Sequence, residues 1–240
     1  MNTWSKVGCC LAAAFASLYA SVSAGEFPYA DYERLEYVHF TGSQYFDTGL
    51  KPTLDPGYEI DVDFAMSSYV ENAHLFATEC NAPYLYASWS TWKKQYIWGC
   101  SGKNRDEASE GCPAWTAGRH TVAYNRVGDK AVVYDGTVLT TGDDHASSSN
   151  LRIGRREATT FVGDVYSFSV TNHSTVAAEL DYVPARERTG DRRVGFWDLV
   201  NETFVPAASG TPEAGPSFIL RTNRPSGRLS SVMSGRMLCR

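Results

Sequence analysis

The chain has 240 residues, of which 43% are hydrophobic and 13% aromatic, and its 22 basic and 27 acidic residues give a net charge of −5. Residues 1–24 and 217–240 hold six of the basic residues and no acidic one, so the body between them has 16 basic and 27 acidic residues. Such an acidic body excludes nucleic acid and anionic membranes as its partners, because both require a basic surface.

The first 24 residues predict a secretory signal peptide. Lys6 supplies a positive start, Val7 to Tyr19 form a short apolar run, and Ala24 ends a stretch of small residues suited to cleavage. The apolar run is shorter than the roughly 20 residues that a membrane-spanning helix needs. No later stretch is longer and equally apolar, so we expect no transmembrane segment. The mature chain is expected to be secreted, periplasmic or at the cell surface.

Short strands separated by turn residues are predicted along the whole body after a lead-in at 25–32. The clearest alternation runs from Tyr58 to Phe64, with apolar residues at even positions and acids at odd positions. Asp135-Gly136 predicts a tight hairpin turn, and Gly163 predicts a bulge or a close backbone approach. The expected strands are 35–40, 44–48, 58–64, 73–78, 84–88, 95–99, 120–124, 131–134, 137–140, 151–153, 161–170, 178–183 and 194–199.

This pattern has no helix-length apolar period outside the signal, and its many short strands are typical of an all-β, antiparallel two-sheet β-sandwich or jelly roll. We expect one domain at 33–216. Residues 217–240 contain five arginines, no acid and no alternation. They are predicted to form a poorly ordered basic tail.

Three stretches carry a family resemblance: Asn150–Val170, Leu35–Pro52, and Val194–Val205 continuing to Pro216. With Pro184 and Arg186, they resemble the laminin G-like (LamG) branch of the concanavalin A-like lectin/glucanase superfamily, as found in secreted bacterial proteins. The resemblance spans about residues 33–216 and implies a curved two-sheet sandwich. The superfamily includes lectins, adhesion modules, calcium-dependent binders and glycosidases. Since the matching residues are scaffold, no catalytic role carries over through them.

A cluster of aromatic residues is the first candidate site. Aromatic planes stack on the apolar faces of sugar rings, while nearby polar groups bond to the hydroxyls. The same rings could instead fill the core of the sandwich. We expect the exposed members to bind a glycan, carried by a polysaccharide or a glycoprotein. The cluster consists of Tyr84, Tyr86, Trp89, Trp92, Tyr96 and Trp98.

Three alternating acids, Glu59, Asp61 and Asp63, form the second candidate site. Some glucanases of this superfamily carry a Glu-x-Asp-x-Glu strand whose carboxylates act as nucleophile, helper and acid/base. Here Asp63 is one methylene shorter than the expected Glu. Alternating acids also occur on any solvated sheet face. We therefore interpret the domain as non-catalytic and keep a glycoside hydrolase that uses these three residues as an alternative.

Two further features concern metal and disulfide chemistry. Asp143 and Asp144 lie together in a turn and are weak candidates for calcium ligands, with an ordinary exposed turn as the other interpretation. No other cofactor is expected.

Four cysteines follow the signal and allow three pairings. We favour Cys100–Cys112, which would close the polar loop between them, with free thiols as the alternative.

Taken as sequence alone, the chain is interpreted as an exported, non-catalytic module that binds carbohydrate at or outside the cell surface. A glycoside hydrolase is one alternative and would release reducing sugars. An adhesion or structural surface protein is the other and would bind a protein partner.

Overall fold

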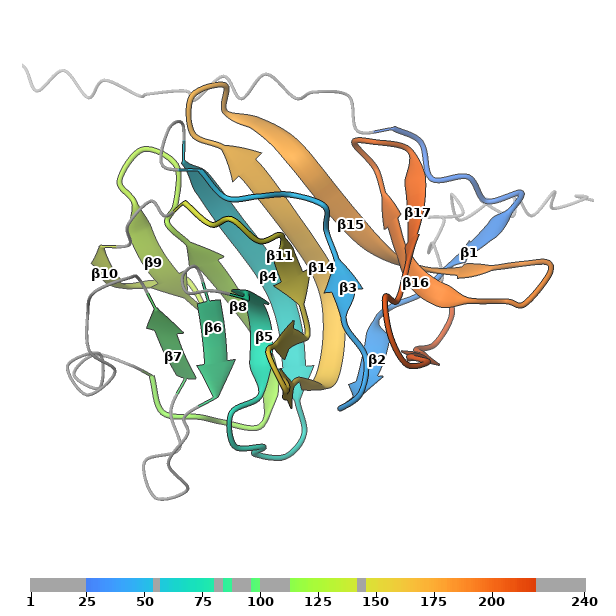
Figure 1. The fold of residues 1–240 in the computed structure, drawn as a ribbon, viewed down its shortest axis with the longest axis horizontal. Coiled ribbons are helices and arrows are strands. Elements are labelled where there is room, and N and C mark those ends of the chain that lie inside the picture. The colour runs from blue at the N-terminus through green and yellow to red at the C-terminus, as the bar shows by residue number, and fades with distance from the viewer. Residues whose placement is uncertain are drawn as a thin grey trace, which may run out of the picture.

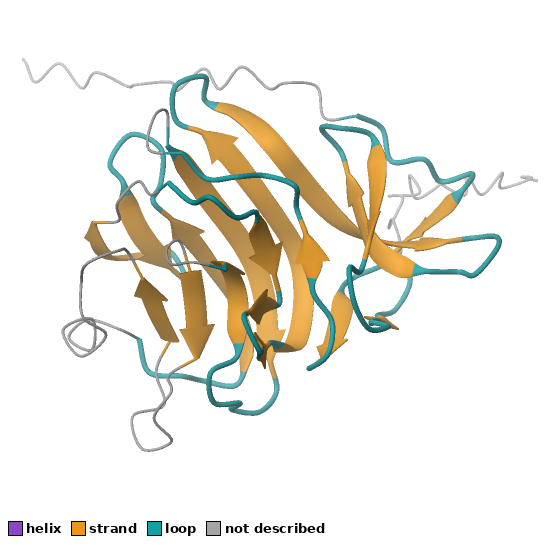
Figure 2. Ribbon diagram, in the orientation of Figure 1, coloured by secondary structure: helices purple, strands orange, loops and turns teal. Residues whose placement is uncertain are grey.

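The computed structural model describes residues 25–53, 57–79, 84–87, 96–99, 113–141 and 146–218, with backbone alone at 84–87, 96–99 and 140–141. Figure 2 shows strands joined by loops throughout these ranges, and no helix among them. None of these ranges holds a helix of the length and hydrophobicity needed to cross a bilayer. The predicted all-β, antiparallel sandwich is confirmed.

The larger of the two main sheets has 11 strands. Its central path runs β10-β9-β8-β4-β14-β15-β16-β17, while β2 pairs with β14, β18 with β2, and β1 with β15. All of these pairings are antiparallel (Figure 1). The strands are β1 (Tyr32–Arg34), β2 (Val38–Thr41), β4 (Tyr58–Met66), β8 (Gly118–Tyr124), β9 (Ala131–Tyr134), β10 (Thr137–Thr141), β14 (Val162–Asn172), β15 (Ala177–Glu187), β16 (Val194–Asp198), β17 (Thr203–Pro206) and β18 (Glu213–Ala214).

The smaller sheet has five strands in the order β3-β11-β5-β6-β7 and packs against one face of the larger sheet (Figure 1). A separate two-stranded ribbon, β12-β13, adjoins it. The strands are β3 (Phe46–Asp47), β5 (His74–Thr78), β6 (Tyr84–Ala87), β7 (Tyr96–Gly99), β11 (Leu151–Ile153), β12 (Arg155–Arg156) and β13 (Thr159–Thr160).

The core lies between the two sheets and is rich in aromatic side chains. Phe76 of the smaller sheet contacts Tyr124 and Phe168 of the larger sheet, with ring centroids 6.1 and 6.4 Å apart. Ile60, Val62 and Phe64 of β4 are buried and Tyr58 packs partly buried against the core, whereas the acids at odd positions are only partly buried and lie on the other face. The alternation at 58–64 therefore predicts the two faces of β4 correctly, and the acids lie on the face directed away from the smaller sheet. We call this face the outer face.

Neighbouring strands in the sequence often lie in different sheets. β2 belongs to the larger sheet and β3 to the smaller one, and the same holds for β14 and β11. Gly42, where the chain crosses from β2 to β3, and Gly154, which links β11 to the β12-β13 ribbon, both have positive φ. A Cβ at Gly154 would lie 2.4 Å from the Phe40 ring, which explains why a glycine is needed at this link.

Packed structure extends to both ends of the described chain. Phe27 is buried against Trp197, and Gly25 N donates to the carbonyl oxygen of Leu199 at 2.8 Å. At the other end, Ser217 forms an antiparallel bridge with Leu35. Residues on either side of the predicted 33–216 domain thus contact its strands.

Candidate functional site

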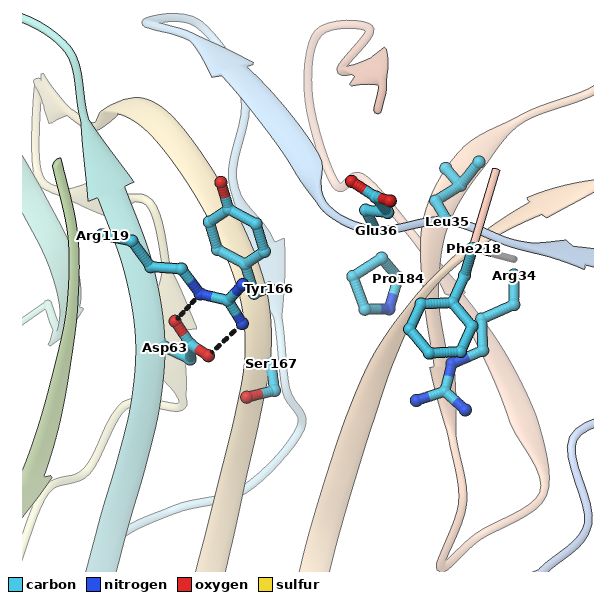
Figure 3. A pocket seen from close by; sticks show the side chains of 9 residues that line it. All are labelled: Arg34, Leu35, Glu36, Asp63, Arg119, Tyr166, Ser167, Pro184 and Phe218. Carbon is cyan, nitrogen blue, oxygen red and sulfur yellow. Dashed lines mark hydrogen bonds and ion pairs between the residues drawn. The ribbon is translucent and has the colours of Figure 1, made fainter. Parts of the chain in front are cut away.

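A cavity of about 380 Å³ opens where β14 and β15 separate. The two strands pair over Phe168–Asn172 of β14, but its first half, Val162–Val165, pairs with β2 instead. Figure 3 shows the side chains that line the opening on the outer face. They are Arg34, Leu35, Glu36, Asp63, Arg119, Tyr166, Ser167, Pro184 and Phe218, and we call this opening the β14/β15 cavity.

A β-bulge brings two consecutive residues of β14 to this cavity. The register with β4 shifts between Val165 and Ser167. A bulge inserts one extra residue, which breaks the strict alternation of faces. Val165 and Phe168 consequently both enter the core, while Tyr166 and Ser167 both line the cavity.

One wall of the cavity is a fixed pair of charges. Arg119 donates from Nε and Nη2 to the two carboxylate oxygens of Asp63, at 2.7 and 2.6 Å. Its guanidinium carbon lies 3.8 Å from the centroid of the Tyr166 ring. The hydrogen bond to Asp63 raises the pKa of Arg119, so this guanidinium stays protonated. We call these two residues the Arg119–Asp63 pair.

The opposite wall comes from the C-terminal end of the described chain. Phe218 N donates to the carbonyl oxygen of Arg34 at 2.8 Å, and the Arg34 guanidinium lies 4.5 Å from the Phe218 ring centroid. Ser217 Oγ donates to Glu33, which also accepts from Arg186. Figure 3 shows the Phe218 ring beside Pro184, across the opening from the Arg119–Asp63 pair. Phe218 as a residue is 40% exposed.

This arrangement suits a polar, uncharged ligand with an apolar face. Arg119 and Asp63 present donors and acceptors at fixed positions, and Phe218 presents an aromatic surface. The lining contains two arginines and two acids, so its charges balance. Sugars combine hydroxyl groups with apolar C–H faces and so match both features.

A second hollow, of about 540 Å³, holds the other two acids of β4. Glu59 Oε2 accepts from Val127 N at 2.6 Å. Burial, followed by the neighbouring Glu59 carboxylate, raises the pKa of Asp61 to about 7. Arg126 and Asp129 form an ion pair at its edge. We call this opening the Glu59/Asp61 hollow.

The three acids of the hydrolase alternative are therefore divided between two openings. Glu59 and Asp61 interact with each other in one, whereas Asp63 lies in the other and both its oxygens accept from Arg119. A glycosidase needs a carboxylic acid and a second carboxylate on either side of one scissile bond. Asp63 is engaged by Arg119 and is not arranged as a free acid/base opposite Glu59.

The predicted aromatic platform is described only in part. Tyr84 pairs with Gly99 and Tyr86 with Ile97, whereas Trp98 pairs with Leu85 and Tyr96 with Ala87. All four aromatic positions therefore lie on two adjacent, paired strands, and the binding role of their side chains stays a prediction. Trp89, Trp92, Cys100, Cys112, Asp143 and Asp144 lie outside the described residues.

Within the described part of the chain, no three His, Cys, Asp or Glu side chains come together as a metal-binding group.

The sequence interpretation missed Arg119 and Phe218 as site residues. Arg119 had no local signal, since one arginine at the start of a strand is usually a solvated side chain. Phe218 had a weak signal, as an aromatic residue directly after Pro216-Ser217 in an otherwise polar tail.

No protein-family model and no curated protein sequence matches this chain. Among solved structures, its fold is similar to a crystal structure of a "putative carbohydrate binding protein" from Bacteroides ovatus, with a TM-score of 0.51 and 12% sequence identity. The match covers 76% of this chain and 60% of that chain. At this identity the similarity concerns the fold.

Proposed function

We propose that this protein is an exported, non-catalytic carbohydrate-binding module whose glycan site is the β14/β15 cavity. One observation carries the proposal: the Arg119–Asp63 pair faces the half-exposed Phe218 ring across an opening of about 380 Å³. A sugar ring in this opening packs its C–H face on Phe218. Its hydroxyls accept from Arg119 and donate to the remaining lone pairs of Asp63.

Two further facts support this assignment. The balanced charge of the lining favours a neutral sugar on a polysaccharide or a glycoprotein over a charged small molecule. The similarity in fold to a protein named for carbohydrate binding agrees with the same class of ligand. Export rests on the signal sequence predicted at residues 1–24, and the LamG-like family membership rests on the resemblance of its scaffold stretches.

A glycan array probed with the mature chain, residues 25–240, tests the function. We expect retention on at least one neutral glycan, with no release of reducing sugars on incubation. Retention that survives a calcium chelator shows that binding needs no calcium, whereas loss of retention supports the calcium alternative. Release of reducing sugars would support the hydrolase alternative. An empty array together with capture of one purified protein partner would support the adhesion alternative.

A further inference from the structure

Gly25 lies tightly against the turn that joins β16 to β17. Its backbone N–H donates to the carbonyl oxygen of Leu199 at 2.8 Å. A Cβ on Gly25 would lie 2.9 Å from the same oxygen and 2.7 Å from Oε1 of Glu202. A side chain at this position would therefore push the backbone away from the Leu199 carbonyl. The turn accepts a glycine here and leaves no room for a larger residue.

Glu202 brings a carboxylate to the nitrogen of Gly25. This nitrogen and the Cβ position are bonded to the same Cα, so the nitrogen lies within about 5 Å of Glu202 Oε1. Glu202 is exposed, and none of the ion pairs among the described residues includes it. Rotation about the bonds of its side chain can close the distance to the roughly 4 Å of an ion pair.

The residues after Gly25 hold it at this turn. Phe27 is buried, and its ring lies 6.4 Å from that of Trp197. Tyr32 packs on the rings of Trp197 and Phe204, with centroids 4.9 and 5.1 Å apart. The segment leads directly into β1, which carries Arg34 of the cavity wall. The position of Gly25 is therefore fixed by packing on strands β16 and β17.

Gly25 is also the residue that directly follows the predicted signal peptide. Ser23 and Ala24 are small residues of the kind that precede a cleavage site. Hydrolysis of the Ala24–Gly25 bond adds one water, leaving a carboxylate on Ala24 and an ammonium group on Gly25. The uncleaved chain has one uncharged N–H at this nitrogen. The cleaved chain has a positive charge and three N–H donors, which suit both the Leu199 carbonyl and the Glu202 carboxylate.

We propose that the Ala24–Gly25 bond is the processing site of this chain, and that the Leu199 carbonyl and the Glu202 carboxylate bind the ammonium group that processing creates. Processing thereby adds an ion pair that the uncleaved chain lacks, and it fastens the segment that leads into β1. This capture of the new N-terminus does not depend on the proposed glycan function.

Mass spectrometry of the exported protein tests the processing site. The full chain, including residues 1–24, is expressed in a bacterium, and the protein outside the cytoplasm is collected. We expect its first residue to be Gly25. An exported protein that starts at any other residue, or a chain that keeps residues 1–24, would overturn the proposal.

Urea denaturation tests the capture in residues 25–240, prepared with either a free or an acetylated Gly25 amine. The acetyl group keeps the N–H that bonds to Leu199 and removes only the charge. In the free-amine chain, Glu202→Gln should reduce the folding equilibrium constant about threefold, as loss of an exposed ion pair does. In the acetylated chain, Glu202→Gln should have no measurable effect, because no ammonium group is present.

Glu157→Gln is the matched control. Glu157 and Glu202 are both exposed glutamates in turns, with φ values of 51° and 48°. Acetylation should not change the effect of Glu157→Gln. Equal effects of Glu202→Gln in the free and acetylated chains would overturn the capture. A dependence on acetylation of the same size for Glu157→Gln would overturn it as well, because the charge would then act without a specific partner.

Discussion

Arg119 of β8 and Asp63 of the adjacent strand β4 bond to each other diagonally, although they are not directly paired in the sheet. The partner of Arg119 on β4 is Ala65, and the partner of Asp63 on β8 is Thr121. The arginine spans this offset with its side chain against the Tyr166 ring and closes two hydrogen bonds, of 2.7 and 2.6 Å, on Asp63. Its donors are thus positioned before a ligand arrives, which lowers the entropy cost of binding.

Phe218 should provide the aromatic contact to the glycan. Phe218→Ala is expected to weaken glycan affinity about tenfold, because an aromatic contact contributes on the order of 1 kcal/mol beyond its buried area. Tyr29→Ala is the matched control, since Tyr29 is 39% exposed against 40% for Phe218 and does not line the cavity. Isothermal titration measures both variants. Equal affinities for the two would show that the Phe218 ring does not contact the ligand.

Gly163 should be indispensable for the junction of β14 with β2 and β4. A Cβ at this position would lie 2.3 Å from the carbonyl oxygen of Ala65, at a φ of +151°. Gly163→Ala should therefore cost about 3 kcal/mol or more of unfolding free energy. Gly190→Ala, at a φ of +66° with nothing within 4 Å, should cost only about 1–2 kcal/mol. Urea denaturation compares the two variants, and similar losses would argue against a steric role for Gly163.

Asp61 should make the stability of the fold depend on pH. Its pKa is raised from an ordinary 3.8 to about 7, so the folded protein holds this proton more tightly than the unfolded chain. The resulting stabilisation is complete below about pH 4 and is lost as pH rises through 7. By urea denaturation at the two pH values, Asp61→Asn should reduce the excess stability at pH 5 over pH 8 by about 2–3 kcal/mol.

Asp129→Asn is the control for this measurement. The hydrogen bond from Arg126, together with that from Ala131 N, lowers the pKa of Asp129 to about 2, so its titration lies outside the range from pH 5 to 8. No difference between Asp61→Asn and the parent chain across this pH range would contradict the raised pKa of Asp61.

The local features of the sandwich could be predicted from the sequence. The alternation from Tyr58 to Phe64 predicts the faces of β4, because side-chain direction in a strand depends only on position. Asp135 and Gly136 adopt φ values of 46° and 77°, as the predicted hairpin turn requires. The close approach at Gly163 is also confirmed, by the nearby Ala65 oxygen.

The candidate site could not be predicted, because it depends on contacts between distant segments. The cavity exists because β14 changes partner from β2 to β15, and because Ser217 returns to Leu35. Neither event leaves a local pattern. The bulge that directs both Tyr166 and Ser167 outward likewise follows from the pairing with β4. Four of the six positions of the predicted aromatic platform lie on the paired strands β6 and β7, and their role in glycan binding stays a prediction.

The affinity of Arg119→Gln for a glycan identified on the array tests the glycan site most directly. Arg193→Gln is the matched control, because Arg193 forms an ion pair with Glu187 just as Arg119 does with Asp63. The two arginine side chains are similarly exposed, at 53% for Arg193 and 57% for Arg119. Exposed ion pairs stabilise proteins by only about 0–1 kcal/mol, so both variants should fold. We predict binding about 10- to 100-fold weaker for Arg119→Gln and unchanged binding for Arg193→Gln, whereas equal binding by the two folded variants would contradict a glycan site in the β14/β15 cavity.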